Sequence, residues 1–286
     1  MVRVVTNGRV APTKRWFQRA LGALGLAAAV IAPAAAFPTA PFRGSLIAVA
    51  PRDATPALWE VRDGDTTIYL FGTFHTLDER TLWFERSVRA AFDRSGELVL
   101  ETITPTSAAE VRAIGRSIAG PRPASNSFLA ATRSAVERGR ADGLSVDRGA
   151  DSVLRRAAAV QGMSLSGIEG FADQLRTFAR ISAASPAAAV APVQSSAPVT
   201  LAALLTAWKA GDTRAFAAML AGFEAKAPLA YRLLITDRNA LYGEWIAHRL
   251  DQPGTVFVAV GSGHLAGKDS VQNWLSAKGI YARRVS

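Results

Sequence analysis

The apolar and polar positions from residue 58 onward first follow β-strand patterns. Two β-rich runs, 58–62 and 66–72, are joined by Asp63, Gly64 and Asp65, a spacing that favours a β-hairpin. Apolar residues then recur at helical spacing over 82–94, and 97–101 is a short apolar run that ends in a carboxylate. These patterns predict a hairpin followed by a helix and a third strand.

Helical periodicity dominates the middle of the chain. The spacing predicts helices over 106–119, 127–140, 151–161, 171–181, 201–210, 213–222, 226–250 and 268–278, and strands over 165–168, 255–260 and 281–285. Strands that alternate with helices predict an α/β fold, with a mixed sheet flanked by helices and a largely helical middle. Four tryptophans at helical spacing are expected in the core: Trp83, Trp208, Trp245 and Trp274.

The first 36 residues have the pattern of a signal peptide. A basic stretch without acids precedes an uncharged apolar run, and Ala34, Ala35 and Ala36 are small residues suited to cleavage. We therefore expect cleavage after Ala36 and a periplasmic or secreted protein. The alternative is an uncleaved anchor, with residues 20–36 holding the protein on the inner membrane.

The composition of the rest of the chain indicates its domain organisation and excludes several kinds of functional site. Residues 37–56 read as a linker and 57–286 as one domain, interrupted by an Ala/Pro/Ser-rich flexible loop at 183–200. The chain has no cysteine, which excludes disulfides, thiolate catalysis and Cys-based zinc sites. Half of the +10 net charge lies in the first 36 residues, and the later arginines alternate with acids, so we expect no nucleic-acid binding.

Two of the three histidines occur in the same context. An apolar strand runs into Gly-x-x-His at 72–75 and again at 261–264. In α/β sheets functional groups gather at the carboxyl ends of strands, and adjacent strands would place His75 and His264 side by side. A third strand ends in Glu101 on the same edge. The simpler alternative is that each histidine caps a strand or fills a turn.

Two imidazoles and a carboxylate are suited to two kinds of chemistry. They can hold a divalent cation and activate its bound water, or act as general acid and base without a metal. The residue types alone leave both open.

The motifs of the sequence, and the order in which they occur, resemble those of the TraB/GumN family. This family includes the Tiki-type metalloproteases and is related to the EreA/ChaN-like fold. The resemblance covers roughly 58–285. It rests on LWEV with IYLFGTFH, LVLE, SLSGIEGFADQL, the pair Arg238 and Asn239, and FVAVGSGHLAGKDSVQNWLSAKGIYARRV. A single Gly-x-x-His is a weak motif, whereas the ordered set is specific.

This resemblance implies roles for individual residues. His75, Glu101 and His264 match catalytic residues that hold a divalent metal ion, with Mn, Co or Zn as candidates. Arg238 matches a further catalytic residue, Glu169 and Asn239 match substrate-binding positions, and Gln174 matches a family glutamine.

Glu169, Arg238 and the loop 267–270 also have simpler interpretations. Glu169 would cap the helix that starts near Gly170, and Arg238 would pair with Asp237 or Glu244 on the surface. The loop 267–270 would either bind an anion or simply cap the following helix.

The function implied by the resemblance is a metal-dependent, peptidase-like hydrolase acting on a peptide or envelope polymer. Two alternatives stay open: a metal-free hydrolase that uses His and Glu as bases, and a non-catalytic envelope protein that binds peptide or polysaccharide.

Overall fold

The computed structural model describes residues 54–105, 107–118, 137, 139–184 and 200–286. The predicted signal peptide, nearly all of the linker, most of the helix expected at 127–140 and the core of the 183–200 loop lie outside the described residues. None of the described helices combines the length and hydropathy that a membrane span requires.

A six-stranded sheet forms the centre of the fold, with the strand order β4-β3-β5-β2-β1-β6. Its strands are β1 (Leu58–Arg62), β2 (Thr66–Thr73), β3 (Glu97–Thr102), β4 (Ser164–Glu169), β5 (Gly254–Gly261) and β6 (Arg283–Arg284). The pairs β2–β5, β5–β3 and β3–β4 are parallel, and β1 is antiparallel to both β2 and β6. The predicted mixed α/β sheet is therefore confirmed.

The predicted hairpin forms at β1 and β2 because Asp63 organises its turn. The Asp63 carboxylate accepts hydrogen bonds from the backbone N–H groups of Thr66 at 2.9 Å and Asp65 at 3.2 Å. This is the local side-chain bonding by which aspartate favours turns. Val61 and Ile68 then pair across the two strands, which sets the register.

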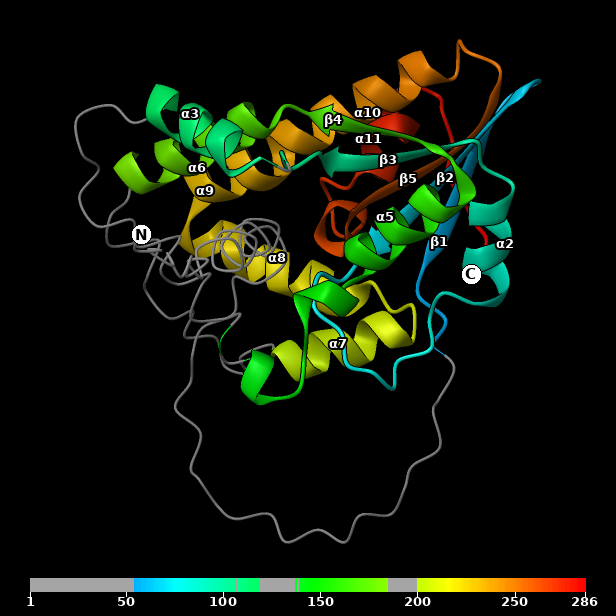
Figure 1. Cartoon of the computed structure of the whole chain (residues 1–286). Helices are drawn as coiled ribbons and strands as arrows, with labels where there is room; N and C mark the ends of the chain where they lie inside the picture. The colour runs from blue at the N-terminus through cyan, green and yellow to red at the C-terminus, as the bar shows by residue number, and fades with distance from the viewer. Residues whose placement is uncertain (1–53, 106, 119–136, 138, 185–199) are drawn as a thin grey trace, which may run out of the picture.

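Helices cover both faces of the sheet (Figure 1). The helical segments are α2 (Arg86–Asp93), α3 (Ala108–Ile118), η2 (Val146–Arg148), α5 (Ala150–Gln161), α6 (Phe171–Ala184), α7 (Leu201–Lys209), α8 (Arg214–Lys226), α9 (Pro228–Tyr231), η3 (Arg232–Thr236), α10 (Asp237–Arg249), η4 (Ser262–Leu265) and α11 (Val271–Ala277). Buried residues of α10 and α11 pack on one face, and those of α2, α5, α7 and α8 pack on the other.

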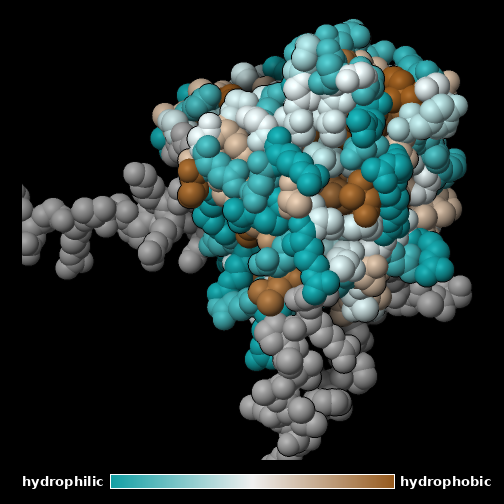
Figure 2. Space-filling model, turned by 90° about the vertical axis from the view of Figure 1, so that its right-hand side faces the viewer, coloured by the Kyte–Doolittle hydropathy of each residue, from teal (hydrophilic) through white to brown (hydrophobic). Residues whose placement is uncertain are grey.

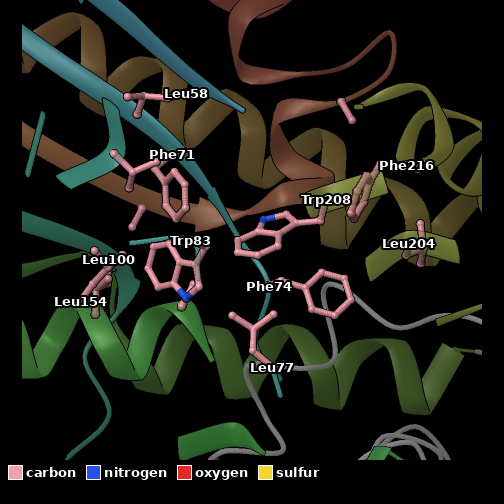
Figure 3. Packing of buried hydrophobic residues seen from close by; sticks show 14 of the residues in the cluster. Leu58, Phe71, Phe74, Leu77, Trp83, Leu100, Leu154, Leu204, Trp208 and Phe216 are labelled. Carbon is pink, nitrogen blue, oxygen red and sulfur yellow. The ribbon is translucent and has the colours of Figure 1, made fainter. Parts of the chain in front are cut away.

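An aromatic cluster fills the core on the α7 side of the sheet (Figure 3). Phe71 stacks on Trp83 with ring centroids 5.4 Å apart, and Trp208 meets Trp83 edge-on at 5.8 Å. The Trp208 indole N–H donates to the Gly72 carbonyl at 2.8 Å, so the strand end next to the first Gly-x-x-His turn is tied to the core. The other two predicted core tryptophans, Trp245 and Trp274, are partly buried against the second cluster.

The helix predicted over 226–250 is divided into three parts. Pro228 starts the short helix α9, the π-helix η3 follows, and α10 begins at Asp237. A π-turn rotates the residues after it relative to a continuous α-helix. Arg238 and Asn239, at the start of α10 directly after this π-helix, are both buried.

Most other differences from the predicted boundaries lie at element ends. The helix expected from 268 begins at Val271 because Ser270 is its N-cap and accepts a hydrogen bond from Asn273 N–H at 3.4 Å. The helix expected from 82 begins only at Arg86. The last strand contains only two residues, Arg283 and Arg284, which pair with β1.

The surface carries no extended apolar area on the face shown in Figure 2, where hydrophobic residues form small patches separated by hydrophilic ones. The most exposed large hydrophobic residues of the described chain are Val160 and Tyr281. Scattered exposed apolar side chains of this kind are ordinary on a protein surface.

Candidate active site

Three neighbouring strands bring the candidate residues to one edge of the sheet. The two Gly-x-x-His turns follow β2 and β5, which are parallel neighbours with Thr73 opposite Gly261. On the other side of β5, Leu100 of β3 lies opposite Ala259, so Glu101, the next residue of β3, lies at the same edge.

The side chains of His75, Glu101 and His264 meet around the backbone of Gly261. A Cβ atom added at Gly261 would lie 3.1 Å from Glu101 Oε1, 3.5 Å from His75 Nε2 and 3.7 Å from His264 Cδ2. A glycine at this position therefore leaves open the small volume between the three groups.

Glu101 is held as a carboxylate by its neighbours. Its Oε1 accepts the Gly261 backbone N–H at 2.6 Å, and its Oε2 accepts from Arg238 Nη2 at 2.5 Å. Burial alone would raise the pKa of Glu101, but Arg238 and the two histidines outweigh burial and lower this pKa to about 2. The side chain is thus negatively charged at neutral pH.

His264 is fully buried and has a defined tautomer. Asn239 Nδ2 donates to the Asp269 carbonyl at 2.6 Å, which turns Asn239 Oδ1 toward the imidazole, 2.5 Å from His264 Nδ1. The proton therefore lies on Nδ1, and Nε2 keeps its lone pair. Burial lowers the pKa of His264 to about 3, so the ring is neutral at physiological pH.

Arg238 links the two carboxylates behind the site. Its Nε donates to Glu169 at 2.7 Å, its Nη2 contacts Glu101 and the Tyr242 hydroxyl, and its Nη1 lies 3.3 Å from His264 Nε2. Tyr242 also donates to Glu169. The side chains of Arg238, Glu101 and Glu169 are all less than a tenth exposed.

These contacts bear on whether Arg238 forms a surface ion pair, whether Glu169 caps a helix, and whether Glu169 and Asn239 bind substrate. Arg238 contacts neither Asp237, which pairs with Arg232, nor Glu244, which pairs with Lys278. Burial raises the pKa of Glu169, and its side chain contacts Arg238 and Tyr242 rather than a helix end. The polar atoms of Asn239 are likewise engaged within the protein, which favours a positioning role for both substrate-binding candidates.

His75 differs from His264 in what lies behind it. Its Nδ1 is 2.5 Å from Asp151 Oδ2, and its Nε2 is buried without a hydrogen-bond partner in the described part of the chain. Burial alone would lower the pKa of His75, but Asp151 outweighs burial and raises it.

The sequence reasoning missed two members of this site, Asp151 and Tyr242. Asp151 lies in the first turn of α5, where an acidic residue ordinarily stabilises the helix start, so nothing distinguished it. Tyr242 follows Arg238 by four residues on α10, and that i,i+4 spacing was the available signal.

The remaining candidates are Gln174 and the loop 267–270. Gln174 is buried in α6. In the loop 267–270, Ser270 caps α11 and the Asp269 carboxylate accepts a hydrogen bond from the Tyr231 hydroxyl at 2.8 Å. Capping therefore accounts for Ser270, whereas the Asp269 carbonyl also accepts the hydrogen bond that orients Asn239.

The donor set suits a divalent metal ion in kind. Each imidazole has its Nδ1 engaged by an oxygen acceptor, as is usual for metal-bound histidines, the Nε2 of His75 has no partner in the described residues, and Glu101 is ionised. The spacing is less suitable, because no group of three His, Asp or Glu side chains in the described residues is arranged as a formed metal site. Arg238 Nη1 also faces His264 Nε2, so a bound cation would have to displace this contact.

Comparisons with known proteins agree with the motif order. Comparison with curated proteins and with solved structures gave no match. The family model described as TraB/PrgY/gumN matches residues 57–119 and 112–284, ranges that include both Gly-x-x-His turns and the Arg238–Asn239 pair. Because these matches cover well over half of the chain and contain the side chains that meet at this sheet edge, the protein belongs to the TraB/PrgY/gumN family.

Proposed function

We propose that the protein is an exported hydrolase that cleaves amide bonds in peptides or in the peptide parts of an envelope polymer. The observation that carries this proposal is the buried, unpartnered Nε2 of His75, which lies beside the ionised Glu101 and the neutral His264. An imidazole nitrogen with a free lone pair in such a place is suited to accept a proton or to bind a metal ion.

The residues of the site have separate roles in the proposed reaction. Glu101 contributes fixed negative charge, Arg238 holds Glu101 in place, and Asn239 keeps the lone pair of His264 on Nε2. When no metal ion is bound, His75 Nε2 takes the proton of the attacking water and returns it to the leaving amine as the C–N bond breaks. A divalent ion held by His75, His264 and Glu101 would supply Lewis-acid activation of that water, with Mn, Co or Zn as candidates.

The first candidate is thus a hydrolase that depends on such a metal ion. A metal-free hydrolase is the second candidate, and the contacts of Arg238 favour it. The guanidinium already places positive charge 3.3 Å from His264 Nε2 and 2.5 Å from Glu101 Oε2, two of the groups that would hold a metal ion. In that case the His75–Asp151 pair alone would activate the water.

The deciding experiment measures metal binding and peptide cleavage by the full chain after chelation. We expect Mn, Co or Zn to raise the melting temperature, since a ligand at about 100 times its Kd stabilises by roughly 2.7 kcal/mol. His75→Ala and His264→Ala should each abolish both this shift and the cleavage. His248→Ala is the matched control, because His248 is exposed and its ring lies 3.0 Å from the Glu244 carbonyl, on α10 and outside the site.

The possible results separate the candidates. Cleavage that resists chelation but is lost in His75→Ala would establish the metal-free hydrolase. Peptide binding without cleavage in the wild type would replace the hydrolase with a non-catalytic binding protein. If none of the metals stabilises the protein and no condition gives cleavage, the proposal is wrong.

Export is proposed from residues 1–36, which lie outside the described residues. Sequencing the N-terminus of the protein recovered from its own cell envelope should find Phe37 as the first residue. A chain that still begins at Met1 and partitions with membranes would instead indicate an uncleaved anchor over 20–36.

A further inference from the structure

We infer that Asp151 is a positioning residue for His75, fixing the orientation and the tautomer that leave Nε2 available; the inference rests on the proposed function and deepens it. Asp151 lies behind His75 relative to Gly261. Its Oδ2 is 2.5 Å from His75 Nδ1, while His75 Nε2 lies 3.5 Å from the position of a Cβ on Gly261.

The contact defines which nitrogen of His75 carries the proton. An ionised carboxylate only accepts hydrogen bonds, so His75 Nδ1 must be the protonated nitrogen and donates to Asp151. In the neutral ring the lone pair is then on Nε2, the buried atom without a partner in the described residues. Without Asp151 nothing described would oppose the other tautomer.

The backbone holds Asp151 in place through the segment 145–151. Leu77 and Ser145 exchange two backbone hydrogen bonds, at 3.2 and 2.9 Å, and Ala150 N–H donates to the Phe74 carbonyl at 3.0 Å. These bonds tie the start of α5 to the loop that carries His75. Backbone hydrogen bonds on both sides of His75 therefore fix the segment that carries the Asp151 carboxylate.

Gly149 makes this close approach possible. A Cβ at this position would lie 2.0 Å from the carbonyl oxygen of His75 and 2.5 Å from its carbonyl carbon. Real Cβ atoms essentially never come this close to backbone atoms, so α5 can dock against His75 only with a glycine immediately before it.

The simpler interpretation is that Asp151 only stabilises the start of α5. An acidic residue in the first turn contributes about 0.3–1 kcal/mol through the helix dipole. That effect alone predicts a small loss of stability on substitution and no change in His75. The similarity to His264 argues against it as the whole explanation, because each histidine has its Nδ1 engaged by an oxygen acceptor, from Asp151 in one case and from the Asn239 amide in the other.

The test reads the tautomer directly. With only three histidines in the sequence, the imidazole nitrogen shifts of the isotope-labelled, metal-free full chain can be assigned with His75→Ala and His248→Ala. We expect the wild type to show His75 protonated on Nδ1, and Asp151→Asn to shift it toward a mixture with Nε2–H. Asp147→Asn is the matched control, an exposed aspartate four residues earlier in the same segment.

Kinetics provide a second measurement. Loss of a partner of this kind typically reduces activity 10- to 100-fold, so kcat for peptide cleavage by Asp151→Asn should fall by roughly that factor. KM should change by less than about twofold, because Asp151 acts through His75 and does not touch substrate. Asp151→Glu retains the charge and should recover part of the rate.

The outcomes are distinct from those of the proposed function. If Asp151→Asn lowers only the melting temperature and leaves the His75 tautomer and kcat unchanged, Asp151 is merely a helix-start residue and the inference is wrong. If the wild type cleaves nothing but the tautomer still shifts in Asp151→Asn, the positioning role stands and only the hydrolase proposal fails.

Discussion

Replacing Arg238 with Met should lower the free energy of unfolding by about 3–5 kcal/mol, because the change leaves two buried carboxylates without their shared cation. Glu101 and Glu169 both contact the guanidinium, and their side chains are 8% and 6% exposed. Methionine has a similar length but offers neither charge nor hydrogen-bond donors. Urea unfolding followed by circular dichroism measures the effect.

Two further variants show whether charge is the cause. Arg176→Met removes an exposed ion pair with Asp173, in which both side chains are more than half exposed, and should cost less than about 1 kcal/mol. Adding Glu169→Gln to Arg238→Met removes one of the two unpaired charges and should recover part of the lost stability. If Arg238→Met were no more destabilising than Arg176→Met, the buried ion-pair network described above would be wrong.

Replacing Gly149 with Ala should destabilise the protein by about 3 kcal/mol, at the upper end of the usual cost of overpacking. The added Cβ would overlap the His75 backbone, which β2 and the aromatic core hold in place. The start of α5 must then move away, and we expect the hydrogen bond between Asp151 and His75 to lengthen. Thermal unfolding and the His75 nitrogen shifts measure the two effects together.

Gly222→Ala is the control for the glycine change itself. Gly222 lies within α8, and a Cβ there would meet no atom within 4 Å. Alanine is favoured over glycine inside helices by roughly 0.5–1 kcal/mol, so this variant should be slightly more stable than the wild type. A Gly149→Ala protein with wild-type stability would show that the docking of α5 on the His75 loop is looser than described.

The local parts of the site could be predicted from the sequence. The apolar runs over β2, β3 and β5 identified strands that lead to His75, Glu101 and His264, because strand patterns depend on neighbouring residues. Glycines before each histidine indicated tight turns at the strand ends. The mixed α/β fold followed from the alternation of strands and helices.

The partners of the buried polar residues could not be predicted in the same way. Arg238 contacts Glu101 and Glu169, which lie 137 and 69 residues earlier in the chain, and His75 contacts Asp151, which lies 76 residues later. No periodicity indicates such pairs, since each depends on how complete elements pack. The surface partners considered for Arg238 were nearby residues, whereas its side chain is buried and pairs with carboxylates from distant strands.

By itself the sequence determined the strands, the helices and the residue types at the strand ends, because these follow from local backbone preference and hydrophobic periodicity. Only the tertiary structure decided that β5 lies between β2 and β3 and that Asp151 stands behind His75. Strand order and buried ion pairs are set by the packing of distant segments, where burying a charge without a partner would cost several kcal/mol.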